Sequence, residues 1–187
     1  MSPTNGGAPW TGFFAALYSG CEGLVELRAL PSAKQCFAPA DDHARLGRFI
    51  AAHDAEDLYM GVATRRDATS GALANCHHLG ALWADVDFKR TPEADARARL
   101  AGLALPPSAI VHSGGGLHCY WFLREPLALQ DEADVVKGLL ARLVVATGGD
   151  VSSAEPAHIL RVPGTWNRKP EYGSPRPVRL EALDAAL

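Results

Sequence analysis

The stretch Leu82-Trp83-Ala84-Asp85-Val86-Asp87-Phe88-Lys89 decides how the rest of the chain is interpreted. Its apolar and aromatic residues, with turn-forming residues outside them, predict a buried strand. Two carboxylates interrupt that strand. Because side chains two positions apart share a face, Asp85 and Asp87 stand on one side with Cα atoms roughly 6.6 Å apart. Two negative charges this close repel each other, so either the pKa of one carboxyl group rises or a cation binds between them. Mg²⁺ and Mn²⁺ prefer oxygen ligands, and two such ions could bridge the pair.

The segments after the acidic strand predict a β-α-β-β-α-β order, which is the RNA-recognition-like or ferredoxin-like unit. In that topology the first and third strands are central neighbours, and the fourth lies on the other side of the first. Asp85 and Asp87 should therefore lie beside His118, with Asp150 approaching the same face. The predicted elements are a strand over 79–89, a helix from a Thr91 cap to about Leu103, strands over 108–113 and 117–123, a helix over 129–146 ended by Gly148-Gly149, and a strand over 157–162.

The residues before this unit predict an N-terminal α/β lobe. The fold class expected is α+β: a lobe over 1–75, packed with a catalytic palm over 76–170, and a tail over 171–187 that begins an accessory helix at 180–187. The lobe's predicted elements are a helix over 10–18, a strand over 23–30 with Glu26 and Arg28 on one face, a helix from Asp41 or Asp42 to about His53, and a strand over 57–64.

A glycine-rich hairpin follows, over residues 111–121. Three consecutive glycines, Gly114-Gly115-Gly116, allow the backbone to approach a ligand closely and to direct N–H groups at phosphate oxygens. No Gly-Lys-Ser/Thr follows, and the next element is a strand, so the hairpin is not a P-loop. His118 is predicted on the same strand face as Tyr120. A mobile hairpin tip with a hydrogen-bonded histidine is the alternative interpretation.

A third pattern covers residues 158–169. A short strand delivers Arg161, Pro163-Gly164 predicts a tight turn, and several donors come after it. Read alone, this is a basic surface loop. The donors are Thr165, Asn167, Arg168 and Lys169.

Composition restricts the class of protein. The net charge of −3 is not typical of a nucleic-acid binder, but residues 161–179 carry five basic residues and one acid, a local +4. Two divalent ions would add four positive charges to the whole chain.

Zinc is not predicted from the cysteines. Cys21, Cys36, Cys76 and Cys119 have no Cys-x-x-Cys spacing, and the neighbours in Cys76-His77-His78 should point in opposite directions. No signal peptide or membrane span is evident, which indicates the cytoplasm.

The predicted topology brings the three patterns to one sheet face. Carboxylates for two metals, a glycine hairpin with a histidine, and an Arg/Lys segment together indicate a nucleoside triphosphate site. Asp85, Asp87 and Asp150 are the candidate ligands of two Mg²⁺ or Mn²⁺ ions. His118, Ser113 and Arg161 are the candidate contacts of the incoming nucleotide.

The ordered motifs, Asp85-x-Asp87-x-Lys89, then Ser113-Gly-Gly-Gly-x-His118-x-Tyr-Trp, then Asp150 followed by Leu160-Arg161-x-Pro-Gly-Thr-x-Asn-x-Lys169, resemble the archaeo-eukaryotic primase superfamily. They look closest to the primase-polymerase branch of phage, plasmid and other mobile-element replication proteins. The resemblance implies a DNA primase-polymerase that joins NTPs or dNTPs on a single-stranded DNA template, with Mg²⁺ or Mn²⁺ at the three acids. The nucleotide contacts that it implies are His118, Ser113, Gly115, Gly116, Arg161, Asn167, Lys169 and Arg65.

One departure and several alternatives remain. Many members of that superfamily carry Ser-x-His, whereas here Gly116 stands two residues before His118. Members often continue into a helical accessory or helicase domain, and an apparent helix at the end of this chain suggests an excised catalytic domain. A non-catalytic RNA-recognition-like binding module is the first alternative, although carboxylates on its sheet face would repel a phosphate backbone. A nucleotide cyclase-like enzyme, suggested by Gly148-Gly149-Asp150, and a repair-type end-filling polymerase are the others.

Overall fold

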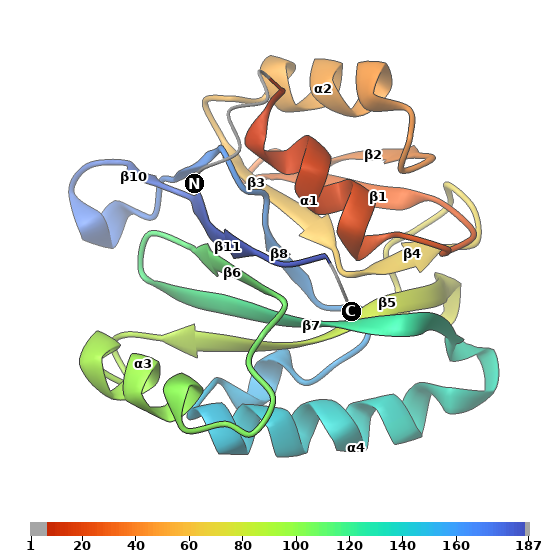
Figure 1. The fold of residues 1–187 in the computed structure, drawn as a ribbon. Coiled ribbons are helices and arrows are strands. Elements are labelled where there is room, and N and C mark those ends of the chain that lie inside the picture. The colour runs from red at the N-terminus through yellow and green to blue at the C-terminus, as the bar shows by residue number, and fades with distance from the viewer. Residues whose placement is uncertain (1–6, 186–187) are drawn as a thin grey trace.

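The protein is described here by a computed structural model that covers residues 7–185. Two antiparallel sheets pack together with helix α1 between them, and helices α3 and α4 cover the outer face of the larger sheet (Figure 1). The five-stranded sheet has the order β11-β6-β7-β5-β4, and the four-stranded sheet has the order β2-β1-β3-β8. A two-stranded ribbon, β9-β10, lies at one end. Helices α1 and α2 touch each other, since the Trp10 ring lies 5.7 Å from the His43 ring, and helices α3 and α4 lie on the other side of the larger sheet.

The larger sheet is built around the long strand that carries the two acids. β5 pairs with β7 on one side and with β4 on the other, so it is a central strand. Its buried residues include Trp83 and Val86. The strands are β4 (Ala63–Arg65), β5 (Cys76–Asp87), β6 (Ala109–His112), β7 (Gly116–Ala128) and β11 (Arg179–Leu183).

The smaller sheet is formed mainly by the N-terminal third of the chain. Glu26 and Arg28 share a face of β1, as predicted, and Arg28 Nε donates to Glu26 Oε1 at 3.0 Å. The strands are β1 (Val25–Leu30), β2 (Lys34–Ala38), β3 (Asp57–Gly61) and β8 (Ile159–Arg161). The ribbon consists of β9 (Trp166–Asn167) and β10 (Arg176–Pro177).

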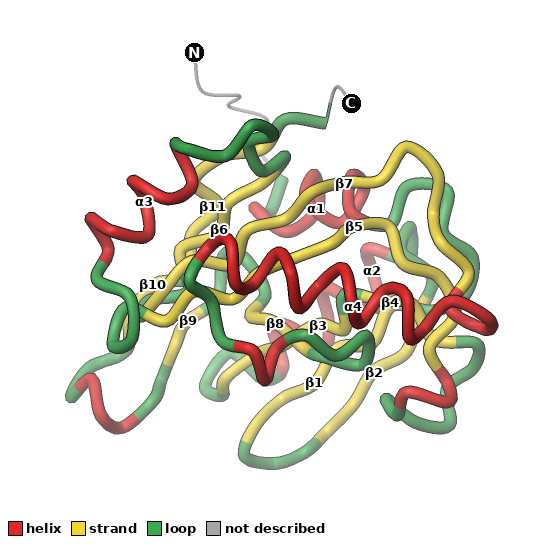
Figure 2. Tube along the Cα trace, turned by 90° about the horizontal axis from the view of Figure 1, so that it is seen from below, coloured by secondary structure: helices red, strands yellow, loops and turns green. Residues whose placement is uncertain are grey.

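Four helices complete the layers, and Figure 2 shows α4 running across the outer face of the larger sheet. Helix α1 buries Trp10, Phe13, Phe14 and Leu17 between the sheets, and the Phe13 ring lies 5.0 Å from that of Tyr120 in β7. The α-helices are α1 (Pro9–Leu17), α2 (His43–Ala52), α3 (Glu93–Ala101) and α4 (Leu129–Thr147), and the short 3₁₀ helices are η1 (Leu73–Asn75), η2 (Val151–Ser153) and η3 (Pro170–Tyr172).

Helix ends follow the predicted signals with one exception. Asp42 Oδ1 accepts from Arg45 N at 3.0 Å at the start of α2, and Gly148 ends α4 with a φ of 74°. Thr91, in contrast, does not cap α3. Its hydroxyl donates to Gly148 O at 2.8 Å and fastens the end of α4 to the start of α3.

Two predicted elements are wrong, and both concern the edges of sheets. The strand near Arg161 does not pair with β5. β8 pairs with β3 in the smaller sheet, since β4 already occupies that edge of β5. The expected C-terminal helix at 180–187 is instead strand β11 over its described part, antiparallel to β6. Strand β2 was also not foreseen.

The sheets exchange strands along the chain. β4 follows β3 within a few residues but joins the larger sheet, and β8 returns late in the chain to the smaller one. A bridge between Leu24 and Arg65 joins the sheets at one end. The predicted division of the chain at residues 75 and 170 stays a prediction.

Within residues 7–185 no helix is both long and apolar enough to cross a bilayer.

Candidate active site

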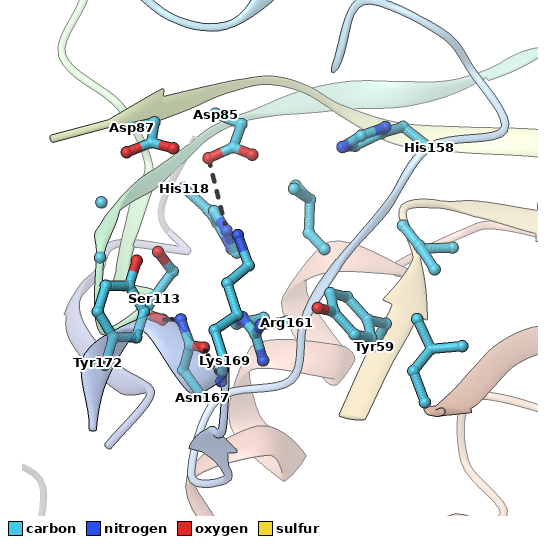
Figure 3. Close-up of a pocket in the computed structure, with 15 residues that line it drawn as sticks. Tyr59, Asp85, Asp87, Ser113, His118, His158, Arg161, Asn167, Lys169 and Tyr172 are labelled. Carbon is cyan, nitrogen blue, oxygen red and sulfur yellow. Dashed lines mark hydrogen bonds and ion pairs between the residues drawn. The ribbon is translucent and has the colours of Figure 1, made fainter. Parts of the chain in front are cut away.

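The predicted neighbour relationship of the acids and the histidine is present in the β5–β7 ladder. Asp85 is the register partner of His118, and Asp87 is the partner of Gly116. Asp85 Oδ1 lies 3.7 Å from His118 Nε2, too far for a hydrogen bond. Both acids and His118 line one cavity (Figure 3).

This cavity has a volume of about 310 Å³ and lies where the two sheets meet. Carboxylates of β5 form one wall, and the cationic side chains of Arg161 and Lys169 lie across from them, as Figure 3 shows. That size suits part of a small ligand, with the remainder outside. The residues opposite the carboxylates are Arg161, Asn167 and Lys169, while His158 lies on the same side as Asp85.

Asp85 is the most perturbed acid of the site. Burial, together with repulsion from Asp87 and Asp150, raises its pKa to about 6, against smaller opposing effects of Lys169 and Arg161. The surroundings of Asp85 therefore disfavour its ionised form, because the nearby cations do not compensate its charge. A hard divalent cation with oxygen ligands would satisfy that need, so Asp85 and Asp87 fit such an ion.

His118 is shifted in the opposite way. Burial, together with the nearby charges of Arg161 and Lys169, lowers its pKa to about 3. The imidazole is therefore neutral at pH 7, and its contact with Asp85 is not an ion pair. Its Nδ1 is buried and has no hydrogen-bond partner among the described residues. A buried polar atom of this kind is costly unless a ligand supplies a partner.

Arg161 reaches the cavity from β8. Its Nη1 forms an ion pair with Asp57, and its guanidinium lies over the Tyr59 ring at 4.7 Å. The other terminal nitrogen, Nη2, is buried with no hydrogen-bond partner in the part of the chain that is described. Asp57 and Tyr59 therefore hold the guanidinium in place, with one N–H group left for an anion.

The glycine hairpin is packed against protein atoms. A Cβ on Gly115 would lie 1.9 Å from Tyr172 Oη, and one on Gly116 would lie 2.1 Å from Val86 O. Asn167 Nδ2 donates to Ser113 O at 2.8 Å, which ties the ribbon to the hairpin. The glycines thus permit close packing beside the cavity, and Ser113, Gly115 and Gly116 all line it.

Two predicted site residues are not brought to the cavity. Asp150 lies near Asp85 through its backbone, since its N–H donates to Asp85 O at 2.7 Å. Its carboxylate, however, pairs with Arg90 at 2.9 Å. Arg65 is fully buried and pairs with Glu26 at 2.7 Å. Neither side chain lines the cavity.

The structure adds residues that the patterns did not single out. His158, Tyr59 and Tyr172 line the cavity. Burial lowers the pKa of His158, which favours its neutral form. His158 stands three residues before Arg161, and the pairing of β8 with β3, which the sequence did not indicate, is what sets it beside the cavity.

A separate group lies at the start of β5. Ligand atoms of Glu22, His77 and His78 are all within 4.8 Å of one another. The two histidine rings are stacked at 4.2 Å, so the expectation that they point apart is wrong. His78 Nδ1 already accepts from Glu22 N at 2.9 Å, which occupies the lone pair a metal would need. Cys76 is buried and does not join the group.

The fold, in which two antiparallel sheets pack together with a cavity where they meet, is archaeo-eukaryotic primase-like. Residues 63–186 match the family model of the RepB DNA-primase N-terminal domain. The chain belongs to that family.

Solved structures agree with this fold. The archaeo-eukaryotic primase domain of the cyanophage S-2L primase-polymerase is 18% identical with a TM-score of 0.62, covering 94% of this chain and 92% of that one. Primase RepB′ is 14% identical with a TM-score of 0.58, and the chain, 94% covered, spans 57% of it. The catalytic domain of primase RepB′ in complex with initiator DNA is 16% identical with a TM-score of 0.56, covering 95% and 86%. No curated protein sequence matches significantly.

Proposed function

We propose that the chain is a DNA primase-polymerase catalytic domain, which joins NTPs or dNTPs on a single-stranded DNA template. The observation that carries the proposal is the separation of charge within one cavity. Asp85 and Asp87 stand on β5, and Arg161 and Lys169 stand across from them. Nucleotidyl transfer needs both the carboxylates and the cationic side chains, because metal ions held by the carboxylates act on the triphosphate together with the cations.

Asp85 and Asp87 would hold Mg²⁺ or Mn²⁺. Bound there, two such ions would activate a 3′-hydroxyl and neutralise the charge of the leaving pyrophosphate. The acids share one strand face, so no movement of the backbone is needed to present both. Asp150 is proposed as a third ligand only if its carboxylate exchanges Arg90 for metal.

Three side chains would hold the triphosphate. Arg161 offers its unpartnered Nη2–H, Lys169 offers an ammonium, and neutral His118 offers a ring nitrogen that has no partner within the described part of the chain. Asn167 and Ser113 would set the position of the hairpin. Arg65 would support the site from within the core, through Glu26.

The template is proposed as DNA. Family membership and the initiator DNA complex of the RepB′ catalytic domain support this choice. Residues 161–179 carry a local charge of +4, and two of their basic residues, Arg161 and Lys169, line the cavity, which suits a nucleic-acid backbone. A helical or helicase domain elsewhere in the full-length protein stays a prediction.

The proposal is tested by incubating the protein with single-stranded DNA, labelled NTPs or dNTPs and Mn²⁺, with and without a primer. Asp87→Asn is the inactive comparison. Asp95→Asn, an exposed acid of α3, is the matched control that should keep full activity. Products of two or more nucleotides without a primer are the expected result.

The other outcomes separate the alternatives. Extension of a supplied end without new starts would identify an end-filling polymerase. Binding of DNA without any incorporation would favour a non-catalytic module. Cyclic products from a nucleotide alone would indicate a cyclase and would contradict template-directed transfer.

A further inference from the structure

A second hollow lies beside the ribbon and is not part of the cavity described above. It has a volume of about 360 Å³, and its lining includes Trp166, Pro177, Val178, Arg179 and Leu180. Trp166 and Pro177 are register partners in the ribbon. Val178 is buried, so the hollow has an apolar floor. We call it the Trp166 groove.

Trp166 is unusual among the tryptophans of this protein. Trp10, Trp83 and Trp121 are at most 7% exposed, whereas Trp166 is 44% exposed. A large aromatic ring left open to solvent beside a hollow is a surface that can stack against another flat group. The Trp166 groove therefore has the shape and chemistry of an aromatic platform.

The charge around the platform is positive. Arg179 lines the groove and is exposed, and it forms no ion pair with any acidic side chain that the structure describes. The nearest acid along β11, Glu181, is instead paired with Arg97 at 3.1 Å. An anionic ligand is thus favoured over a neutral one.

The ribbon connects the groove to the proposed catalytic cavity. Asn167 lines the cavity, and its neighbour Trp166 lines the groove, because adjacent residues of a strand point to opposite faces. The strands of this ribbon, labelled β9 and β10 in Figure 2, lie at one end of the larger sheet. A polymer long enough to pass the edge of the ribbon could touch both sites.

We propose that the Trp166 groove binds single-stranded nucleic acid, with one base stacked on the indole of Trp166 and the adjoining phosphate held by Arg179. This proposal rests on the proposed function for the identity of the polymer. Aromatic platforms within a basic surface hold single strands with little dependence on sequence, because every base has a flat face. The groove would hold the strand away from the reacting end.

The experiment uses the intrinsic fluorescence of the whole chain and a labelled oligothymidine, without nucleotides or metal. We expect oligothymidine to quench tryptophan emission, since Trp166 is the accessible indole. Trp166→Phe should lose the quenching but keep its affinity, measured by anisotropy of the label, within about 3-fold. Trp166→Ala should weaken binding about 5- to 100-fold. Arg179→Gln should weaken it and reduce the slope of log affinity against log salt by about 1.

Matched controls are available on the same molecule. Leu183→Ala removes an exposed apolar side chain of β11 outside the groove, and Arg124→Gln removes an exposed arginine of β7. Neither should change affinity by more than about 2-fold. Equal binding by Trp166→Ala and the wild type would overturn the proposal. The proposal would also be overturned if oligothymidine left the tryptophan emission unchanged while a proline-rich peptide quenched it. The same holds if the emission were quenched only by raising the protein concentration.

This readout is independent of catalysis. Asp87→Asn should bind oligothymidine as the wild type does. If that variant and the wild type both bind through Trp166 but the wild type incorporates no nucleotide, the proposed function fails and the groove stands. If the wild type incorporates nucleotides and Trp166→Ala binds normally, the groove fails and the proposed function stands.

Discussion

Asp85 and His118 face each other across the β5–β7 ladder, with Asp85 Oδ1 3.7 Å from His118 Nε2, and the pKa of each is displaced toward its uncharged form. The acid is raised to about 6 and the imidazole is lowered to about 3. Burial is the main cause of both shifts. A bound cation beside Asp85 would favour the carboxylate, so the pair is prepared for a ligand that brings its own charge.

The first prediction concerns metal binding. Asp85→Asn and Asp87→Asn should each abolish nucleotide incorporation and should also remove the stabilisation that Mn²⁺ gives. At a Mn²⁺ concentration 100 times the dissociation constant, the wild type should gain about 2.7 kcal/mol, or roughly 5–10 °C in Tm. Differential scanning fluorimetry checks this without any substrate. An undiminished Mn²⁺ shift in either variant would remove that acid from the metal site, and Asp95→Asn should behave as the wild type.

The second prediction concerns pH in the absence of metal. The pKa of Asp85 is higher in the folded chain, about 6, than the ordinary value of 3.8. The folded state therefore binds the proton more tightly, and stability falls as pH rises from about 4 to 6. Asp85→Asn should be more stable than the wild type at pH 7.5, by on the order of 2 kcal/mol, and the difference should shrink toward pH 4. Urea unfolding at both pH values measures it, and a constant difference would contradict the assignment.

The third prediction concerns His118. His118→Ala should raise the KM for the nucleotide about 10-fold, because His118 lines the cavity in which the triphosphate is proposed to bind. The maximal rate should change less. Steady-state kinetics on a primed template separates the two constants. An unchanged KM with a lower kcat would place His118 in the chemical step instead.

The fourth prediction concerns Arg65, which the sequence placed at the nucleotide. Arg65→Met leaves the buried carboxylate of Glu26 with only Arg28 as a cationic partner. Unfolding should become easier by about 3–5 kcal/mol, as is common when one partner of a buried pair is removed. The double variant Arg65→Met/Glu26→Leu should recover part of that loss. If the single variant keeps its stability but loses nucleotide affinity, the direct role is restored.

The fifth prediction concerns the hairpin. Gly115→Ala adds a Cβ at 1.9 Å from Tyr172 Oη, so Tyr172 must move away from the cavity. We expect a loss of about 1–3 kcal/mol in stability and lower nucleotide affinity. Tyr172→Ala removes the clashing ring, and the double variant should be no less stable than Tyr172→Ala alone. If the double variant is less stable than Tyr172→Ala, Gly115 is required for its backbone conformation or for a ligand, and not for packing against Tyr172.

The acidic strand could be predicted because its physics is local. Alternating apolar residues fixed which face Asp85 and Asp87 share, and the order of elements placed His118 on the neighbouring strand. Helix limits at Asp42 and Gly148 followed from capping chemistry. These inferences need only neighbours in the sequence or the pairing of one hairpin.

What could not be predicted depends on long-range competition for sheet edges. Nothing near Arg161 indicates that β4 has taken the edge of β5, and therefore that β8 must pair with β3. That pairing brought His158 and Tyr59 to the cavity. Likewise, the burial of Arg65 depends on Glu26, 39 positions earlier in the chain. A pattern of charges cannot distinguish a buried pair from a phosphate contact.

The exchange of strands between the two sheets has a consequence for how this protein can be divided. A cut near residue 75 would leave an N-terminal fragment without β8 and a C-terminal fragment without β4, so neither would possess a complete ladder. Such fragments should be inactive apart and should regain structure only when mixed. The protein is therefore suited to split-protein complementation. Recovered activity would report that the fragment carrying Asp85 and Asp87 has paired with the fragment that carries β4.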